Sequence, residues 1–262
     1  MFGLTHILYL VISFAVSAAL IILGRRYLKT AEAHNLAVRA CAIVTVLLHI
    51  SPLWVDYLSE GSATVESVML FPIHPCNVCM WLLLLITYLK RDSLAYKLLS
   101  EFLLLGGTVC GVIGLVFNEN FGNNPTLADW GVFKGMLSHS TMILGTLYLG
   151  FSGLVKIRFR CTVSVTAGLL ILFIDGLIIN GIYALFELDP CNSMYLLEPP
   201  FENMPWLTTL VMGIAGMVVA FAITTLYERI VLKKKCKQIF TISNLLDFGI
   251  KSVETPELPV EI

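Results

Sequence analysis

Residues 71–79 read Phe-Pro-Ile-His-Pro-Cys-Asn-Val-Cys and lie near the front of an apolar run that extends from Val68 to Leu89. The two prolines interrupt any helix that includes them, because each lacks an N–H group and its ring clashes with the preceding turn. We therefore predict that a helix starts at Pro75, with His74 as its N-cap and Cys76 one position inside. The N–H groups and the positive dipole end of a helix start stabilise a thiolate. The stretch predicts a reactive thiol at the start of an apolar helix.

The composition around this stretch is that of a membrane protein. The chain has 262 residues, of which 57% are hydrophobic and 13% charged, and its mean hydropathy is +0.85. A spanning helix needs roughly 20 apolar residues. We expect an all-α, polytopic membrane protein with seven transmembrane helices, at residues 4–23, 36–54, 68–89, 94–117, 132–151, 162–186 and 206–231. Residues 1–231 form this domain, and residues 232–262 form a basic, amphipathic cytoplasmic tail.

The distribution of basic residues predicts the orientation of the bundle. With seven spans, all of the 17 Lys and Arg residues except Lys134 fall on one side. Lys and Arg favour the cytoplasmic side, so the N-terminus is expected outside and the C-terminus in the cytoplasm. The predicted location is the cell membrane, with membrane lipids as partners. The net charge of −1 gives no sign of nucleic-acid binding. No cofactor is predicted, and the oligomeric state stays open.

Four polar side chains on different predicted helices fall in one layer, about two helical turns beneath the outer surface. They are His49, Cys76, His139 and Asn180. Ionisable groups inside a bilayer are costly unless they face one another or a wet cavity, so such a layer indicates a functional site. A thiol, an imidazole and an amide are the parts of acyl transfer through a thioester. The expected catalytic residues are Cys76 as nucleophile, His139 as base and His74 as an orienting group.

Further polar side chains are expected to line the substrate site. Some share one face of the sixth predicted span, one follows the fourth span, and one lies in the loop at residues 187–205, which is rich in turn residues and can fold back as a lid. The predicted substrate-binding residues are Asn180, Tyr183, His49, Asn118 and Tyr195.

Three alternatives compete with this interpretation. A single Cys in a membrane helix is usually a small hydrophobic residue, and a single His is often an interhelical hydrogen-bond partner. The polar layer can also be the pocket of a non-enzymatic protein that binds or transports a small molecule or an ion. The third alternative is a metal site formed by His49, His74, Cys76 and His139. Cys76 and Cys79 can also be metal ligands or a redox pair with Cys110 or Cys191, but no second Cys pair at zinc-ribbon spacing supports this.

Three motifs carry a resemblance to a known family. They are Pro72-Ile73-His74-Pro75-Cys76, Ser138-His139-Ser140, and Asn192-Ser193-Met194-Tyr195-Leu196 followed by Glu198-Pro199-Pro200. Their order over most of the seven-helix region resembles the YwaF-like family of bacterial integral membrane proteins. Pro75 stands where that family has an apolar residue, and Ser193 stands where it has an aromatic one.

The resemblance implies a function. Animal membrane proteins related to the YwaF-like family are reported as phospholipid acyltransferases that use a cysteine and a histidine, and these roles would fall to Cys76 and His139. The expected protein is an integral membrane lipid acyltransferase or acyl hydrolase whose site faces the outer leaflet.

Overall fold

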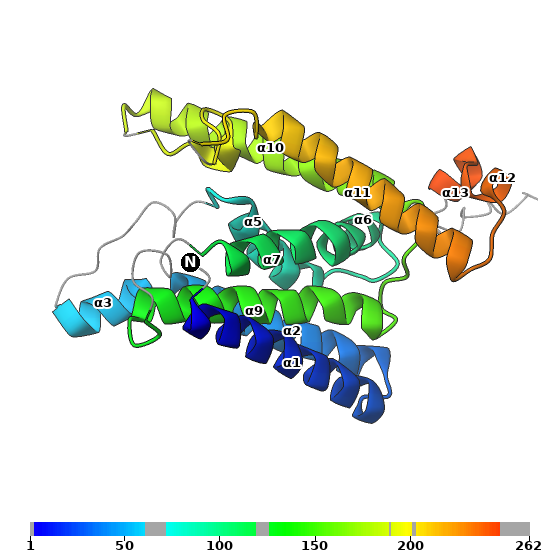
Figure 1. Ribbon diagram of the computed structural model, residues 1–262, viewed down its shortest axis with the longest axis horizontal. Coiled ribbons are helices and arrows are strands. Elements are labelled where there is room, and N and C mark those ends of the chain that lie inside the picture. Colours follow the sequence, from blue (N-terminus) through cyan, green and yellow to red (C-terminus); the bar gives the residue numbers. More distant parts are fainter. Residues whose placement is uncertain (1–2, 61–71, 119–125, 189, 201–202, 247–262) are drawn as a thin grey trace, which may run out of the picture.

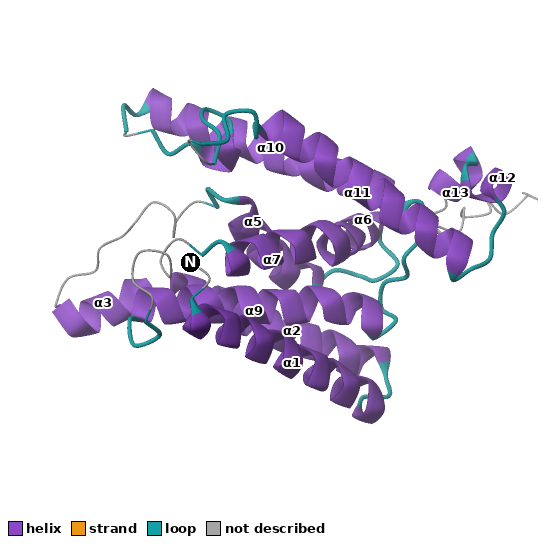
Figure 2. Cartoon of the chain, in the orientation of Figure 1, coloured by secondary structure: helices purple, strands orange, loops and turns teal. Residues whose placement is uncertain are grey.

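The computed structural model describes residues 3–60, 72–118, 126–188, 190–200 and 203–246. Within these residues the chain is helical and has no strands (Figure 2). The long helices are α1 (Leu4–Tyr27), α2 (Ala31–Ile50), α9 (Trp130–Phe151), α10 (Cys161–Leu185) and α11 (Thr209–Ile230). The shorter elements are α3 (Pro52–Glu60), α5 (Pro75–Ile86), α6 (Leu94–Phe102), the π-helix η1 (Leu103–Gly107), α7 (Thr108–Val116), the 3₁₀ turn η2 (Ser193–Tyr195), α12 (Cys236–Ile239) and α13 (Ile242–Leu246).

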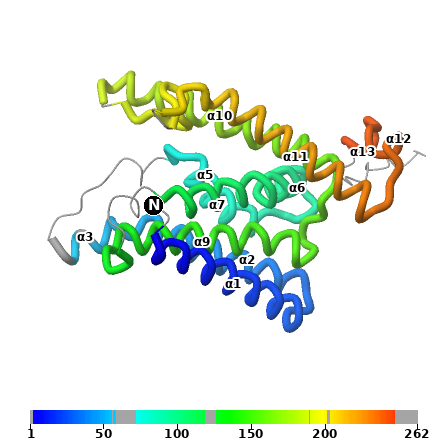
Figure 3. Tube along the Cα trace, viewed as in Figure 1, coloured from blue at the N-terminus to red at the C-terminus, as the bar shows by residue number. Residues whose placement is uncertain are grey.

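Five helices of the described chain are long and apolar enough to cross a membrane. They are α1, α2, the continuous helix of α6, η1 and α7, and the helices α10 and α11. Figure 3 shows the chain running from α6 into α7 without a turn. The 12-residue α5 rises only about 18 Å, less than the roughly 30 Å of a bilayer core. The all-α membrane architecture is confirmed, and the count of seven spans stays a prediction.

Helix α9 has 22 residues and is not among these five, although it was predicted to span the bilayer. It carries Lys134 and the polar run Ser138-His139-Ser140-Thr141, which lower its hydropathy. This helix packs against α1, α2, α7 and η1, so neighbouring helices cover much of its surface. A helix in this central position can carry polar groups that a lipid-facing helix cannot.

The helices form three layers (Figure 1). The lower layer holds α1, α2 and α9, the middle layer holds α5, α6 and α7, and the upper layer holds α10 beside α11. Contacts of α9 with α7 join the lower and middle layers, and contacts of α10 with α6 join the middle and upper layers. Glycines permit the close approach of α7 to α9, since a Cβ added at Gly111 would lie 2.8 Å from Cγ1 of Ile143.

The start of α5 confirms the prediction made from the prolines. Helix α5 begins at Pro75, and His74 is its N-cap with extended dihedral angles (φ −102°, ψ 150°). The backbone N–H groups of Asn77 and Val78 both donate to the His74 carbonyl oxygen, at 2.9 and 3.3 Å. Residues 68–71, which we expected to belong to the same helix, lie outside the described residues.

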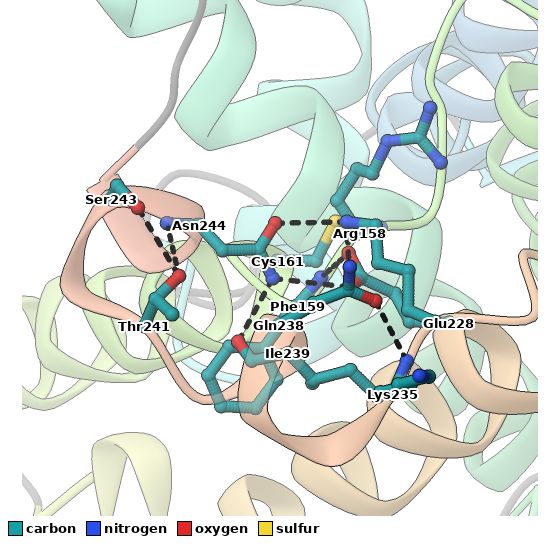
Figure 4. Close-up of polar contacts among 11 residues, drawn as sticks. Arg158, Phe159, Cys161, Glu228, Lys235, Gln238, Ile239, Thr241, Ser243 and Asn244 are labelled. Carbon is teal, nitrogen blue, oxygen red and sulfur yellow. Dashed lines mark hydrogen bonds and ion pairs between the residues drawn. The ribbon is translucent and has the colours of Figure 1, made fainter.

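The chain after α11 folds back onto the end of the bundle opposite the N-terminus (Figure 1). Glu228 of α11 is fully buried and accepts hydrogen bonds from the Phe159 N–H at 2.9 Å, from Lys234 Nζ at 2.9 Å and from Asn244 Nδ2 at 3.1 Å. Figure 4 shows Glu228 with its hydrogen-bond partners Phe159 and Asn244. Lys234 and Asn244, in the segment predicted as a cytoplasmic tail, are therefore held by a buried carboxylate of α11.

Candidate functional site

The segment that leads into α5 is attached to the loop that follows α10. The carbonyl oxygen of Ile73 accepts hydrogen bonds from the Met194 N–H at 2.9 Å and from Ser193 Oγ at 3.2 Å. Ile73, Ser193 and Met194 are all buried. The loop therefore folds back over the start of α5, as the turn-rich sequence led us to expect.

This loop has an unusual backbone. Asn192, Met194 and Tyr195 have positive φ angles of 45°, 53° and 57°, although none of them is glycine. Residues other than glycine enter this region at a cost, and they persist there only where the surroundings hold them. Helix α10 contacts the loop closely, since a Cβ added at Gly176 would lie 2.9 Å from Cβ of Met194.

Asn180 of α10 is the main polar anchor of the loop. Its Oδ1 accepts from the Ser193 N–H at 2.8 Å and from Cys191 Sγ at 3.4 Å. Its Nδ2 donates to the Ser193 carbonyl oxygen at 3.1 Å. Both ends of the Asn180 amide are thus bonded to the loop. We predicted this residue as a substrate ligand; the structure gives it a positioning role, and contact with a substrate stays a prediction.

Two other predicted substrate-binding residues belong to the same region. The Tyr195 ring stacks on the His74 ring, with centroids 5.6 Å apart and an interplanar angle of 30°. Tyr183 is buried and forms a small apolar cluster with Ile73 and Ile179. Tyr183 and Tyr195 therefore lie against Ile73 and His74, the two residues just before Pro75, and Asn180 anchors the loop that contains Tyr195.

His139 belongs to α9, and its ring lies against Gly114 of α7. Its Nδ1 is 2.7 Å from the Gly135 carbonyl oxygen. A carbonyl oxygen only accepts, so Nδ1 carries the proton and Nε2 presents a lone pair. Within the described chain, Nε2 is buried and has no hydrogen-bond partner. Helix α5 packs against both α7 and α9, so the region around His139 adjoins α5.

The remaining two predicted substrate-binding residues lie near this histidine or on α2. Asn118 is buried beside α9, where a Cβ added at Gly135 would lie 3.0 Å from its Nδ2. Asn118 thus contacts the turn whose carbonyl orients His139. His49 is half-buried near the end of α2, and its Nε2 is shielded from solvent.

Cys76 is half-buried in the first turn of α5, and all seven cysteines are thiols rather than disulfides. The Cys76 thiol donates to Oδ1 of Asn77 at 3.5 Å. Asn77 has a side-chain Nδ2 that is buried and unpartnered within the described chain. We did not predict a role for Asn77 from the sequence. The signal was present, since an amide beside a thiol in an apolar run is costly to bury.

The structure gives no support to the metal alternative. In the described ranges, no three or more His, Cys, Asp or Glu side chains are grouped to hold a metal ion. Two hollows lie away from Cys76. One of about 290 Å³ is lined by Glu32, Asn35, Leu36, Arg39 and Arg91, and one of about 400 Å³ lies between α1 and α9.

The tight packing of His139 gives a first prediction. A Cβ added at Gly114 would overlap the His139 ring, because the ring fills the space over this glycine. Gly114→Ala is therefore expected to displace the ring and to lower the free energy of unfolding by about 1–3 kcal/mol, the usual cost of overpacking. Gly213→Ala in α11 is the matched control, since nothing lies within 4 Å of its added Cβ. Equal thermal unfolding midpoints for the two variants would contradict the prediction.

The anchoring of the loop gives a second prediction. Asn180→Ala removes the acceptor of Cys191 Sγ and of the Ser193 N–H, so the loop is expected to open more often. The rate of Cys191 labelling by a water-soluble maleimide should rise several-fold, while labelling of the exposed Cys236 stays constant as an internal control. Unchanged Cys191 labelling would show that the strained loop holds its position without Asn180.

Comparison with known proteins identifies the family of the chain. The model of the TMEM164 family, a membrane protein family, matches residues 1–227 of the 262. This match includes α5, α9, α10 and the loop that joins α10 to α11. A comparison with curated proteins and one with solved structures returned no match. The relationship to the YwaF-like family that the motifs suggested stays a prediction. The chain belongs to the TMEM164 family.

Proposed function

We propose that this membrane protein is a lipid acyltransferase or acyl hydrolase in which Cys76 is the nucleophile and His139 the general base. The observation that carries the proposal is the tautomer of His139. Its Nδ1–H is bonded to the Gly135 carbonyl oxygen, so the buried Nε2 presents a lone pair where α9 packs against Gly114 of α7. Helix α5, which carries Cys76, packs against both α7 and α9. A thiol with a neutral imidazole oriented as a proton acceptor is the arrangement used in nucleophilic catalysis.

The reaction proceeds in two steps. The Cys76 thiol loses its proton to Nε2 of His139, and the sulfur attacks the carbonyl carbon of a glycerolipid ester. The C–O bond of the ester then breaks, the leaving alkoxide takes the proton from His139, and a thioester remains on Cys76. In the second step His139 removes a proton from the hydroxyl of a lysolipid or from water. This oxygen attacks the thioester, and the thiolate leaves and is reprotonated.

The environment favours a lipid substrate at the outer leaflet. The α5 start lies on the side of the N-terminus, and the basic residues at the α1–α2 turn and after α11 lie at the opposite end (Figure 1). In membrane proteins, Lys and Arg residues are concentrated in the loops on the cytoplasmic side. We therefore infer an outer N-terminus, a cytoplasmic C-terminus and seven spans. The two spans beyond the five long apolar helices are α9 and the segment at residues 68–89, of which α5 is a part. The cell membrane is the inferred location.

The proposal is tested by trapping the thioester. The full chain is purified, placed in phosphatidylcholine nanodiscs and incubated with a lysolipid, and the peptides are analysed by mass spectrometry. An acyl adduct that neutral hydroxylamine removes is expected on Cys76. Cys191→Ser is the matched control, since Cys191 is also a half-buried thiol on the same side, and this variant should keep the adduct.

The Cys76→Ala variant completes this test. It is expected to lose both the adduct and the transfer of acyl groups to the lysolipid, while its thermal unfolding stays close to that of the wild type. Acyl transfer that continues without the thiol would sink the proposal. A wild-type protein that binds lipid but forms no thioester would favour the alternative of a non-enzymatic pocket.

A further inference from the structure

Asn77 presents one end of its side-chain amide to the proposed nucleophile. Its Oδ1 accepts the Cys76 thiol at 3.5 Å, and its side chain is buried with 4% of the residue exposed. The other end of the same amide, Nδ2, is buried without a hydrogen-bond partner in the described part of the chain. A buried amide nitrogen with two unused N–H donors is expensive, so each such group in a native protein needs an explanation.

Two backbone N–H groups at the start of α5 are already engaged. Helix starts commonly offer N–H groups to anions, but here those of Asn77 and Val78 already donate to the His74 carbonyl oxygen. Pro75 has no N–H group at all. A side-chain donor therefore adds to what this helix start offers to negative charge next to Cys76. Nδ2 of Asn77 belongs to the residue that follows Cys76 and is unpartnered in the described part of the chain.

We propose that Nδ2 of Asn77 is the oxyanion donor of the acyl-transfer reaction; this inference rests on the proposed function. When the Cys76 sulfur bonds to the ester carbonyl carbon, the π electron pair of the carbonyl moves onto its oxygen. The N–H groups of Nδ2 donate to this oxygen while it is negative. When the pair returns and expels the alkoxide, the donors relax. Oδ1 of the same amide accepts the hydrogen bond of the Cys76 thiol before the attack. One side chain therefore orients the nucleophile and stabilises the negative charge on the substrate oxygen.

The test compares Asn77→Ala with Asn35→Ala in nanodiscs of the full chain. Asn35 is a suitable control because its amide donates to the carbonyl oxygen of Thr87, which caps the end of α5 opposite to Cys76. Removing one oxyanion donor costs about 10²–10³-fold in kcat. We expect this loss for Asn77→Ala with KM nearly unchanged, and no loss for Asn35→Ala.

Two further measurements separate charge stabilisation from a purely structural role. The alkylation rate of Cys76 reports whether the thiol is still in place, and the Asn77→Ala variant should keep it within about fivefold of the wild type. A lipid trifluoromethyl ketone forms a tetrahedral adduct with a cysteine and carries the oxyanion, so its affinity should fall in parallel with kcat.

The outcomes distinguish the inference from the function on which it rests. If wild-type Cys76 forms a thioester and Asn77→Ala turns over at a normal rate, the oxyanion role is overturned and the proposed function stands. The role is also overturned if kcat and Cys76 alkylation fall by the same factor, since Asn77 then only positions the thiol. If wild-type Cys76 forms no thioester, both proposals fail together.

Discussion

Replacing His139 with alanine is expected to lower the rate of thioester formation at Cys76 by about 10²–10⁴-fold, the usual contribution of a general base. The reason is the loss of Nε2, whose lone pair is kept available because Nδ1 donates to Gly135. The rate of acyl-adduct formation on Cys76 measures the effect. The difference in this rate between the wild type and His139→Ala should shrink as the pH rises, because an increasing fraction of the Cys76 thiol then ionises without a base.

The matched control for this experiment is His34→Ala. His34 also has one ring nitrogen in a hydrogen bond, with its Nδ1 2.8 Å from the Tyr148 hydroxyl, but it lies at the opposite end of α2 from His49. This variant is expected to form the thioester at a normal rate. A deficit for His139→Ala that stays constant from neutral to alkaline pH would argue against a base and in favour of a packing role for the ring.

The start of α5 illustrates what the sequence predicts well. Proline has only a few acceptable positions in a helix, so Pro75 could be placed at the first turn and His74 at the N-cap without knowledge of the tertiary structure. The close packing at Gly111 and Gly114 of α7 has a similarly local cause, since small residues allow neighbouring helices to approach. These are local constraints, and local chemistry is visible in one sequence.

The partner of a polar side chain is not visible in the same way. Asn180 was expected near the end of its helix, but its amide is satisfied by a loop in which Asn192, Met194 and Tyr195 have positive φ angles. Such backbone angles have no strong sequence signal, because they are imposed by the surroundings. No role was predicted for Asn77. An amide in an apolar run is visible in the sequence, but the lack of a hydrogen-bond partner for its Nδ2 within the described residues is visible only in the structure.

The largest effect on stability is expected at the buried ion pair between α6 and the start of α10. The Glu101 side chain is 2% exposed, and its carboxylate accepts from Arg160 at 2.7 Å and from Ser164 Oγ at 2.6 Å. Arg160→Ala leaves the Glu101 charge buried without its cation. Breaking a buried pair by removing one partner costs about 3–5 kcal/mol. We expect this loss in the free energy of unfolding, measured by denaturant titration in mixed micelles.

Two controls show whether burial is the cause. Arg91 pairs with Glu32 where the side chains are 40% and 76% exposed, so Arg91→Ala should leave the free energy of unfolding nearly unchanged. The double variant Arg160→Ala with Glu101→Gln removes the stranded charge but keeps an acceptor for Ser164, and it should recover most of the lost stability. If the double variant is as unstable as Arg160→Ala alone, the arginine stabilises the fold through its packing and not by neutralising Glu101.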